Sequence, residues 1–192
     1  MSFYTSLSGL KAAQTDLNVI SNNVANTNST GFKKSRALFG DLFTASPTQA
    51  TSSIAGQGVS LSGITQQFTQ GTMQPTDKTL DLAIAGDGFF AVKSQPPSDA
   101  LSYSRNGAFS VNDDYEVVDT IGSKAQLLPV DANGVITSTN AADMVDFVVP
   151  EFDPLDPAAL LTNISINTEG VVSATFSNGN QTKLGAIAMA SF

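Results

Sequence analysis

The chain has 192 residues, with nine Lys and Arg against 17 Asp and Glu, and it contains no His and no Cys. The missing residue types exclude an imidazole base, a thiol nucleophile, a disulfide and a Cys/His zinc site, leaving only metals held by oxygen ligands. The net charge of -8 argues against nucleic acid as a general partner, because phosphate binding requires a basic surface. The hydrophobic content of 41% is close to the globular average and is sufficient for a folded core.

Residues 3 to 27 carry the apolar pattern of a long helix. The apolar positions recur at steps of four and three, which is the spacing of a coiled coil. They are Phe3, Leu7, Leu10, Leu17 and Val24, with Ile20 widening the stripe and Gln14 and Ser21 interrupting it. Such a helix either packs on its own domain or needs partners from other chains. We favour the second interpretation, because no other segment shows a comparable stripe and a lone helix of this length is marginal in water.

Four Asn residues fall within seven positions at the expected end of this helix, namely Asn22, Asn23, Asn26 and Asn28. Asn tolerates the left-handed conformation and bonds its own backbone, so we expect the helix to fray into a turn, with Gly31 as a permissive stop. The amides either cap the helix or hydrogen-bond neighbouring subunits without charge.

Residues 33–75 are predicted to be a connector. Lys33, Lys34 and Arg36 form the only basic cluster of the sequence, and the first 40 residues carry a net charge of +3, from four bases and one acid. We expect these three side chains to meet acidic residues of a neighbouring subunit.

The rest of the connector is predicted from composition and alternation. Residues 37–43 are compatible with one or two helical turns, and residues 44–58, rich in Ser, Thr, Ala, Gln and Gly, should be mobile. From Val59 to Phe68 the apolar residues alternate, which predicts an extended strand with an irregularity near Gly63.

Residues 76–192 are predicted to be β-rich. Short apolar runs alternate with explicit turn signals such as Asn106-Gly107, Asn133-Gly134 and Asn178-Gly179. Many short strands at close spacing predict an antiparallel sandwich or irregular barrel, so the fold class is α+β. The predicted strands are 80–84, 89–92, 101–103, 108–111, 115–118, 125–128, 147–149, 164–166, 171–176 and 184–192.

Acidic residues are the candidates for acid/base catalysis. Between Val111 and Gly170 there are eleven acids and one base, Lys124. Glycoside hydrolysis needs two carboxylates that face each other across a cleft. Asp113-Asp114 lies in a predicted turn and Asp153-Pro-Leu-Asp156-Pro in a predicted loop, and we interpret both as solvated turns. Asp131-Ala-Asn133-Gly134 resembles the start of a calcium loop but lacks its final Glu, so a short turn is expected. The candidates are Asp113, Asp114, Glu116, Asp143, Asp146, Glu151, Asp153 and Asp156. We predict no enzyme activity and no cofactor.

Export and membrane signals are sparse. No stretch approaches 18 consecutive apolar residues, so no membrane span is expected. The first residues lack a basic region followed by an apolar run, so we expect no cleaved secretory signal and, if the protein is exported, a route that keeps its N-terminus.

Four motifs resemble the bacterial flagellar rod and hook family. The first runs through Asn22-Asn23-Val24-Ala25-Asn26 to Gly31-Phe32-Lys33, and resembles the family's N-terminal signature. The others are Phe68–Thr76 with Leu80–Phe90, then Tyr103-Ser-Arg-Asn-Gly-Ala-Phe109, then Leu184–Phe192. Within the family the chain is most similar to hook subunits, through its opening Met1-Ser-Phe3, its Phe39-Gly-Asp-Leu-Phe43 run and its short connector.

The resemblance implies a structural subunit that polymerises into a short curved tube between rod and filament and transmits torque as a universal joint. Terminal helices would pair as a coiled coil in the inner tube, with β domains outside, and export would follow the flagellar type III route without a cleaved signal. The implied partners are other copies of the chain, adjoining rod and junction proteins, the hook cap and the export apparatus, with no nucleic acid and no membrane insertion. The implied location is the extracellular hook of the flagellum.

Two departures from the family pattern are expected to matter. The family ends with a long heptad helix, whereas this sequence stops at Phe192, so the partner helix is expected outside the given chain. Hook subunits also carry large outer β domains, and here residues 147–150 are followed quickly by the closing strands. A rod subunit therefore remains an alternative, and a secreted β-rich binding module is a second.

The expected organisation is a helical segment over 1–32, a connector over 33–75 and a β-rich domain over 76–192. The predicted subunit interface combines the apolar stripe, the amides and the basic cluster. Its residues are Leu7, Leu10, Leu17, Ile20, Asn22, Asn23, Val24, Asn26, Lys33, Lys34 and Arg36.

Overall fold

The structure of the chain is a computed structural model that describes residues 2–42 and 56–191. The chain forms two compact units, Met1–Thr69 and Gln70–Phe192. The first contains one long helix and a two-stranded sheet, and the second contains an antiparallel sheet of eleven strands. The predicted α+β class with a long N-terminal helix and an antiparallel β-rich domain is confirmed.

The helix α1 spans Ser2–Ala25. It ends where Asn side chains begin to compete with the helix for backbone hydrogen bonds. The Asn26 N–H still donates to the Asn22 carbonyl at 3.1 Å. Successive turns then lead to Gly31, whose φ of 73° lies in the left-handed region that glycine adopts without strain. The predicted helix end and its glycine stop are confirmed.

A β-hairpin follows the helix. Strand β1 (Ser35–Asp41) pairs antiparallel with β2 (Val59–Gln66). Leu38 lies opposite Gly63 while Phe39 lies opposite Leu61, so Ser62 is an extra residue on β2, and the irregularity predicted near Gly63 is confirmed.

The prediction of helical turns over 37–43 is wrong for residues 37–41, which belong to β1. A helix this short is unfavourable in water, whereas pairing with β2 gives the same backbone groups a full ladder of hydrogen bonds. The segment predicted to be mobile, 44–58, lies outside the described residues as far as residue 55.

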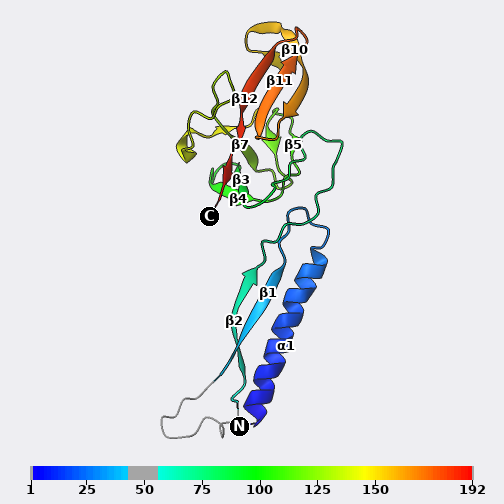
Figure 1. The fold of residues 1–192 in the computed structure, drawn as a ribbon, viewed down its shortest axis with the longest axis vertical. Helices are drawn as coiled ribbons and strands as arrows, with labels where there is room; N and C mark the ends of the chain where they lie inside the picture. The colour runs from blue at the N-terminus through cyan, green and yellow to red at the C-terminus, as the bar shows by residue number, and fades with distance from the viewer. Residues whose placement is uncertain (1, 43–55, 192) are drawn as a thin grey trace. The chain divides into compact units, whose positions relative to one another are not determined.

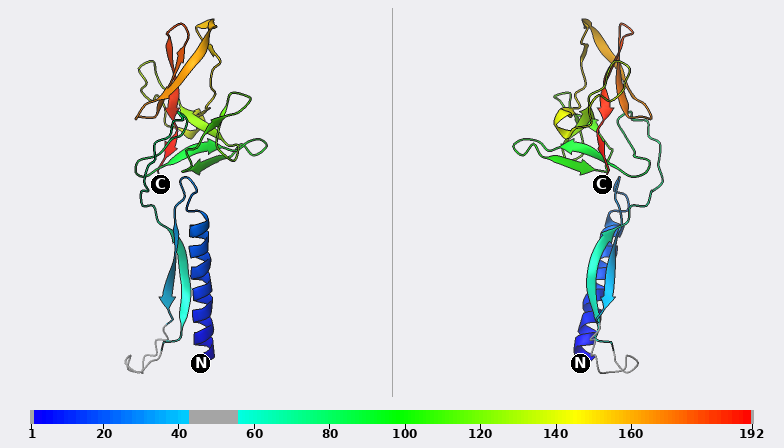
Figure 2. Two further views of the ribbon diagram at one scale, coloured as in Figure 1. Left: turned by 90° about the vertical axis from the view of Figure 1, so that its right-hand side faces the viewer. Right: turned by 60° about the vertical axis from the view of Figure 1, so that its left-hand side comes forward.

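In the first unit α1 lies along one face of the hairpin (Figures 1 and 2). Val19 of α1 and Ala37 of β1 are the buried apolar residues of this contact. A small side chain on the strand lets the helix approach closely, and this contact fixes which side of α1 faces the hairpin.

The second unit is a branched antiparallel sheet in which the strand order is β13-β3-β7-β12-β11-β10-β9. Strand β4 pairs with β3, strands β6 and β8 pair with β7, and β5 pairs with β6. Figure 1 shows β10, β11 and β12 as a long arm at one end of this unit, with β3 and β4 at the other. The strands are β3 (Phe89–Lys93), β4 (Leu101–Ser104), β5 (Ser110–Val111), β6 (Val117–Val118), β7 (Lys124–Leu128), β8 (Val145–Asp146), β9 (Phe152–Asp153), β10 (Asp156–Ile166), β11 (Val171–Phe176), β12 (Gln181–Ile187) and β13 (Met189–Ala190), with a 3-10 turn η2 at Ala141–Asp143.

The main core of this unit gathers apolar residues from most of these strands. Phe90 and Phe109 meet edge to face, with ring centroids 5.6 Å apart. Gly107 allows this packing, since a Cβ there would lie 1.8 Å from the Leu82 carbonyl oxygen. The core comprises Phe90, Val92, Phe109, Val117, Ala125, Leu127, Phe147, Val149, Val172 and Ile187.

Two predicted strands do not form as predicted. Residues 80–84 make one isolated bridge, at Asp81, and residues 147–149 likewise make one, at Val148. Both runs are apolar because they pack on the core: Leu80, Leu82 and Ile84 lie against it, and Phe147 lies inside it. Conversely, β10 begins at Asp156, well before the predicted start at 164.

Candidate assembly surface

The side of α1 that faces the hairpin carries small and polar residues. Val19 is 8% exposed, and the Ser8 hydroxyl accepts a hydrogen bond from the Val59 N–H at 3.3 Å. At the other end, Asn23 forms a pair of hydrogen bonds with the backbone of Ser35: its Nδ2 donates to the carbonyl at 2.8 Å and its Oδ1 accepts from the N–H at 2.9 Å. The helix is therefore held to its own hairpin mainly by its less hydrophobic side.

The apolar stripe lies on the other side of α1. Phe3, Leu10, Leu17 and Val24 are 77%, 67%, 63% and 69% exposed. An α-helix turns by about 100° per residue, so the side chains at these four positions lie on the side of the helix axis roughly opposite Ser8, Thr15, Val19 and Asn23. Ile20 is also exposed and Leu7 is half-buried. An amphipathic helix normally buries its apolar side. Within the described residues, α1 instead leaves its apolar side exposed and packs on the hairpin with its more polar side.

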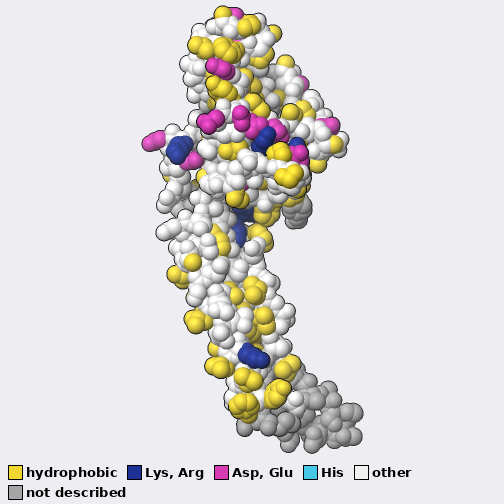
Figure 3. Space-filling model, turned by 180° about the vertical axis from the view of Figure 1, so that it is seen from behind, with side chains coloured by type: hydrophobic (Ala, Val, Ile, Leu, Met, Phe, Trp, Pro, Cys, Tyr) yellow, Lys and Arg dark blue, Asp and Glu magenta, His cyan; other side chains and the backbone are white. Residues whose placement is uncertain are grey.

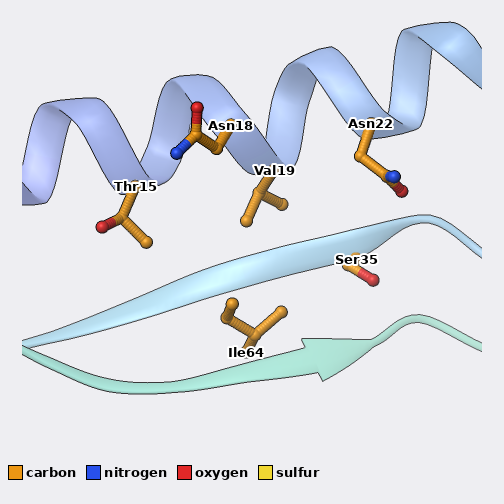
Figure 4. A pocket seen from close by; sticks show the side chains of 6 residues that line it. All are labelled: Thr15, Asn18, Val19, Asn22, Ser35 and Ile64. Carbon is orange, nitrogen blue, oxygen red and sulfur yellow. The ribbon is translucent and has the colours of Figure 1, made fainter.

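The Asn residues have divided roles. Asn23 holds the start of β1, as described, and Asn26 Oδ1 accepts from the Ser29 hydroxyl at 3.1 Å while its Nδ2 donates to the Asn22 carbonyl at 3.0 Å. Asn22 is exposed, and its side chain lines a groove beside the hairpin. Capping and local bracing thus engage Asn23 and Asn26 within the chain, while the Asn22 side chain has no hydrogen-bond partner among the described residues and lies on the hairpin side of α1 (Figure 4).

The basic cluster is also divided. Lys33 Nζ donates to the Thr69 carbonyl at 2.8 Å, which ties the start of β1 to the segment that leaves β2. Lys34 and Arg36 are exposed, and neither forms an ion pair with a described residue. Arg36 pairs with Thr65 across the hairpin, one position from the buried Ala37, so it lies on the face turned away from α1. Two of the three cations are therefore available to another molecule.

A groove of about 370 Å³ runs between α1 and the hairpin. Val19 and Ile64 face each other across it, and hydroxyl and amide side chains surround them (Figure 4). Its lining residues are Thr15, Asn18, Val19, Asn22, Ser35 and Ile64, none of them charged.

The two units carry net charges of opposite sign. Met1–Thr69 contains four Lys or Arg and two Asp, a net charge of +2, whereas Gln70–Phe192 contains five bases and 15 acids, a net charge of -10. Figure 3 shows acidic side chains crossing the face of the β-rich unit that it presents, and hydrophobic side chains along the exposed face of the helical unit. The two units therefore offer surfaces of opposite charge.

Two of the candidate catalytic acids share one cation. Glu116 is paired with Lys124, which also lies 3.7 Å from Asp146. Hydrogen bonds from Lys124 and Asn112 lower the pKa of Glu116, and the hydrogen bond to Glu116 raises the pKa of Lys124. Both groups are thus charged at neutral pH and brace neighbouring strands.

The solvated-turn interpretation is confirmed for Asp113 and Asp114, whereas for Asp153 the predicted turn forms but the carboxylate is buried. Asp113 and Asp114 are exposed in a turn, where the Asn112 side chain accepts from the Asp114 N–H, and Asp131 accepts from the N–H groups of its own turn. Asp153, however, is 2% exposed, because its carboxylate ties together the two hairpins of the long arm. It accepts hydrogen bonds from Asn178 Nδ2, Asn180 Nδ2 and the Leu155 N–H at 2.9, 3.0 and 3.0 Å. Hydrogen bonding by Asn178, Leu155 and Asn180 lowers its pKa.

Other kinds of site find no support in the described part of the chain. It contains no group of three or more acids placed to hold a metal ion. None of its helices is both long enough and apolar enough to cross a membrane.

Two features of the surface escaped the sequence analysis. The Asn23 pair with Ser35 joins residues twelve positions apart, and no local pattern marks it. The groove depends on β1 being a strand, and that strand was predicted to be helical. Small residues recur at helical spacing at Ser8, Ala12 and Thr15, and this recurrence was the available sequence signal that a second element packs on that side of the helix.

Comparison with known proteins identifies two family matches. The family described as flagellar hook protein FlgE/F/G D1 domain matches residues 83–174, and the family described as flagella basal body rod protein matches residues 3–33. Together they lie in both units of the chain.

Individual relatives include both hook and rod proteins. Flagellar hook protein FlgE of Salmonella typhimurium is 43% identical over 122 residues, covering 64% of this chain and 28% of that protein. FlgE of Borreliella burgdorferi is 35% identical over 161 residues, covering 78% of this chain and 36% of that protein. Flagellar basal-body rod protein FlgG of the same organism is 31% identical over 201 residues, covering 98% of this chain and 66% of that protein. The chain thus spans between 28% and 36% of the length of these hook relatives.

Proposed function

Because the chain belongs to the family of flagellar rod and hook proteins, we propose that this axial structural subunit builds the flagellar hook. Copies polymerise into a curved tube that joins rod to filament and transmits torque as a universal joint. The role is structural rather than enzymatic.

The observation that carries the proposal is the exposed apolar stripe of α1. Exposed apolar area is unfavourable by about 25 cal/mol per Å², and contiguous exposed stripes on a soluble protein indicate an interaction site. Phe3, Leu10, Leu17 and Val24 repeat every seven residues, so the uncovered surface has the periodicity of a helical assembly interface.

The subunit interface comprises this stripe, with Leu7 and Ile20 beside it, and the exposed amide of Asn22. Lys34 and Arg36 meet acidic side chains of a neighbouring copy, which the opposite charges of the two units support. Asn23, Asn26 and Lys33 contribute indirectly, since their side chains already bond within the chain.

Hook is favoured over rod by similarity. Over the matched regions the hook proteins of Salmonella typhimurium and Borreliella burgdorferi are 43% and 35% identical to the chain, against 31% for the rod protein of Borreliella burgdorferi. A rod subunit is the second candidate, favoured by the greater extent of the rod matches, which cover 94% and 98% of this chain.

The wider setting follows from the same proposal. The subunit leaves the cell through the flagellar type III route without a cleaved signal, assembles beneath a hook cap, and contacts rod and junction proteins at the ends of the tube. The assembled subunit lies in the extracellular hook.

An antibody against residues 70–192, used to label isolated flagella with their basal bodies, tests the proposal by electron microscopy. Label on the curved segment between rod and filament is the expected result. Label on the straight segment below it would assign the chain to the rod, and label on neither would overturn the axial role.

A further inference from the structure

We propose that Lys124 and Asn112 become joined by an intramolecular isopeptide bond, which the chain forms by itself with Glu116 as the proton relay. The bond links the Lys124 Nζ to the Asn112 Cγ and releases ammonia. The inference goes beyond the proposed function and does not depend on it, because all three side chains lie within the β-rich unit.

One carboxylate contacts both of the groups that react. Glu116 Oε1 accepts a hydrogen bond from Lys124 Nζ, and Glu116 Oε2 accepts one from Asn112 Nδ2 at 3.1 Å. The Lys124 and Glu116 side chains are only 20% and 18% exposed, which limits competition from water. Holding an amine and an amide together in this way replaces a chance encounter by an intramolecular reaction. The shared carboxylate is placed to carry protons from the amine to the leaving group.

The oxygen of the Asn112 side chain is held by two backbone donors. Its Oδ1 accepts from the Glu116 N–H at 2.8 Å and from the Asp114 N–H at 3.0 Å. Because an N–H can donate only to the oxygen, these bonds fix the orientation of the amide, with Nδ2 toward the Glu116 carboxylate. Negative charge develops on Oδ1 when an amine adds to Cγ, and two backbone N–H groups at these distances stabilise that charge as an oxyanion hole does.

The atoms and protons balance without another reactant. Lys124 is protonated at neutral pH, because the hydrogen bond to Glu116 raises its pKa, and the amine becomes a nucleophile when this proton passes to Glu116. The Nζ–Cγ bond then forms and the Cγ–Nδ2 bond breaks. Nζ loses two protons as it becomes an amide nitrogen, Glu116 passes both to Nδ2, and ammonium leaves. Glu116 ends ionised, as it began.

The charged groups around Lys124 control the first proton transfer. Asp146 lies 3.7 Å from Lys124 Nζ and, like Glu116, favours the protonated amine. Lys93 lies directly opposite Lys124 on β3 and disfavours that form, although its own charge is paired with Asp99 at 3.5 Å. The acids are closer, so the bond should form slowly at neutral pH and faster as the pH approaches the pKa of Lys124.

The bond would strengthen a weakly paired part of the sheet. Strands β5 and β6 pair through two residues each, and β6 meets β7 only where Val118 lies opposite Lys124. A link from Asn112, directly after β5, to the start of β7 closes a loop around β6. Such a loop restricts the unfolded chain as a disulfide does, and the sequence has no Cys to form one.

Mass spectrometry of the 192-residue chain tests the bond. During incubation at neutral and at mildly alkaline pH, we expect the intact mass to fall by one molecule of ammonia, several-fold faster at the higher pH. Trypsin requires a free Lys amine, so cleavage between Lys124 and Ala125 should be lost in the reacted protein. An unchanged mass with complete cleavage after Lys124 at both pH values would overturn the inference.

Two matched Lys variants identify the amine. Lys124→Arg keeps the positive charge but replaces the amine by a guanidinium that does not attack amides, so the loss of ammonia should disappear. Lys93→Arg, at the neighbouring cation that has a different acid partner, should react at the unaltered rate. Loss of ammonia from Lys124→Arg at the rate of the unaltered chain would place the reaction elsewhere and overturn the inference.

Glu116→Gln tests the relay. Gln can still hydrogen-bond but cannot take up a proton, so the rate should fall by about 100-fold or more. Circular dichroism that matches the unaltered chain shows that the fold persists in this variant. An unchanged rate in a folded Glu116→Gln protein would contradict the role of Glu116.

Discussion

At the level of single residues, two polar side chains form the hydrogen bonds that join neighbouring secondary-structure elements. Asn23 presents its amide to both backbone groups of Ser35, as a neighbouring strand would, and Asp153 collects three donors at a buried position between two hairpins. Removing one partner of a buried or half-buried hydrogen bond leaves the other unsatisfied, so each position should be sensitive to small changes.

Asn23→Ala should loosen the start of β1. The loss of two hydrogen bonds lowers the local free energy of opening by about 1–3 kcal/mol, and amide hydrogen exchange at Ser35 should accelerate accordingly. Asn22→Ala is the control, because its side-chain amide has no hydrogen-bond partner among the described residues. Equal exchange rates in both variants would contradict the bracing role.

Asp153 should make the β-rich unit sensitive to acid. Its pKa is lowered in the folded state, so its stabilising effect is present above the pKa of an unfolded Asp, about 4, and is lost as the pH falls through the lower folded value. Asp153→Asn should therefore lower the melting temperature by several degrees at neutral pH, with the difference shrinking in acid.

Thermal denaturation across pH checks this, with Asp113→Asn, at an exposed turn, as the control. A melting-temperature difference for Asp153→Asn that stays constant down to pH 2 would exclude titration of Asp153 as its cause.

At the level of elements, α1 is the part whose orientation matters most. Its hairpin contact uses Val19 and small polar side chains, while its apolar stripe remains exposed. The helix therefore links two contacts, one within the chain and one with another molecule, and its two sides should respond differently to mutation.

Leu17→Asp should prevent polymerisation. Burial of a Leu side chain contributes about 1.5–3 kcal/mol, and a buried, unpaired carboxylate adds a further penalty. Sedimentation should show loss of polymer, while near-ultraviolet circular dichroism of the aromatic residues in Gln70–Phe192 stays unchanged, since Leu17 lies in the other unit.

Leu17→Met is the matched control and should assemble normally, because it retains apolar volume. Normal polymer from Leu17→Asp would end the assignment of the stripe to the subunit interface.

At the level of the whole molecule, charge is divided between the units, +2 against -10. Such an arrangement allows one copy to attract the next in a defined orientation, and salt should weaken it. Lys34 and Arg36 are the cations of the basic cluster that form no ion pair with a described residue.

Neutralising these two residues together, as Lys34→Gln with Arg36→Gln, should raise the critical concentration for assembly several-fold. Exposed ion pairs contribute about 0.2–1 kcal/mol each, and the salt dependence of assembly should flatten when they are lost. Lys33→Gln alone should have a smaller effect, because Lys33 already bonds the Thr69 carbonyl. A double variant with unchanged critical concentration and salt dependence would contradict the charge contact.

The local features of this protein could be predicted from its residues alone. The helix, its glycine stop, the irregular strand near Gly63 and most strands of the β-rich unit follow from periodicity and turn residues, because these patterns reflect backbone geometry over a few positions. The apolar stripe and the family motifs were readable for the same reason.

Which surfaces are covered became clear from the three-dimensional fold. Residues 37–41 became a strand because β2 pairs with them, and Asp153 became buried because Asn178 and Asn180 reach it from another hairpin. The side of α1 that meets the hairpin was set by its fit to Ala37 and Ile64. These outcomes depend on contacts between residues far apart in the chain, which no local pattern encodes.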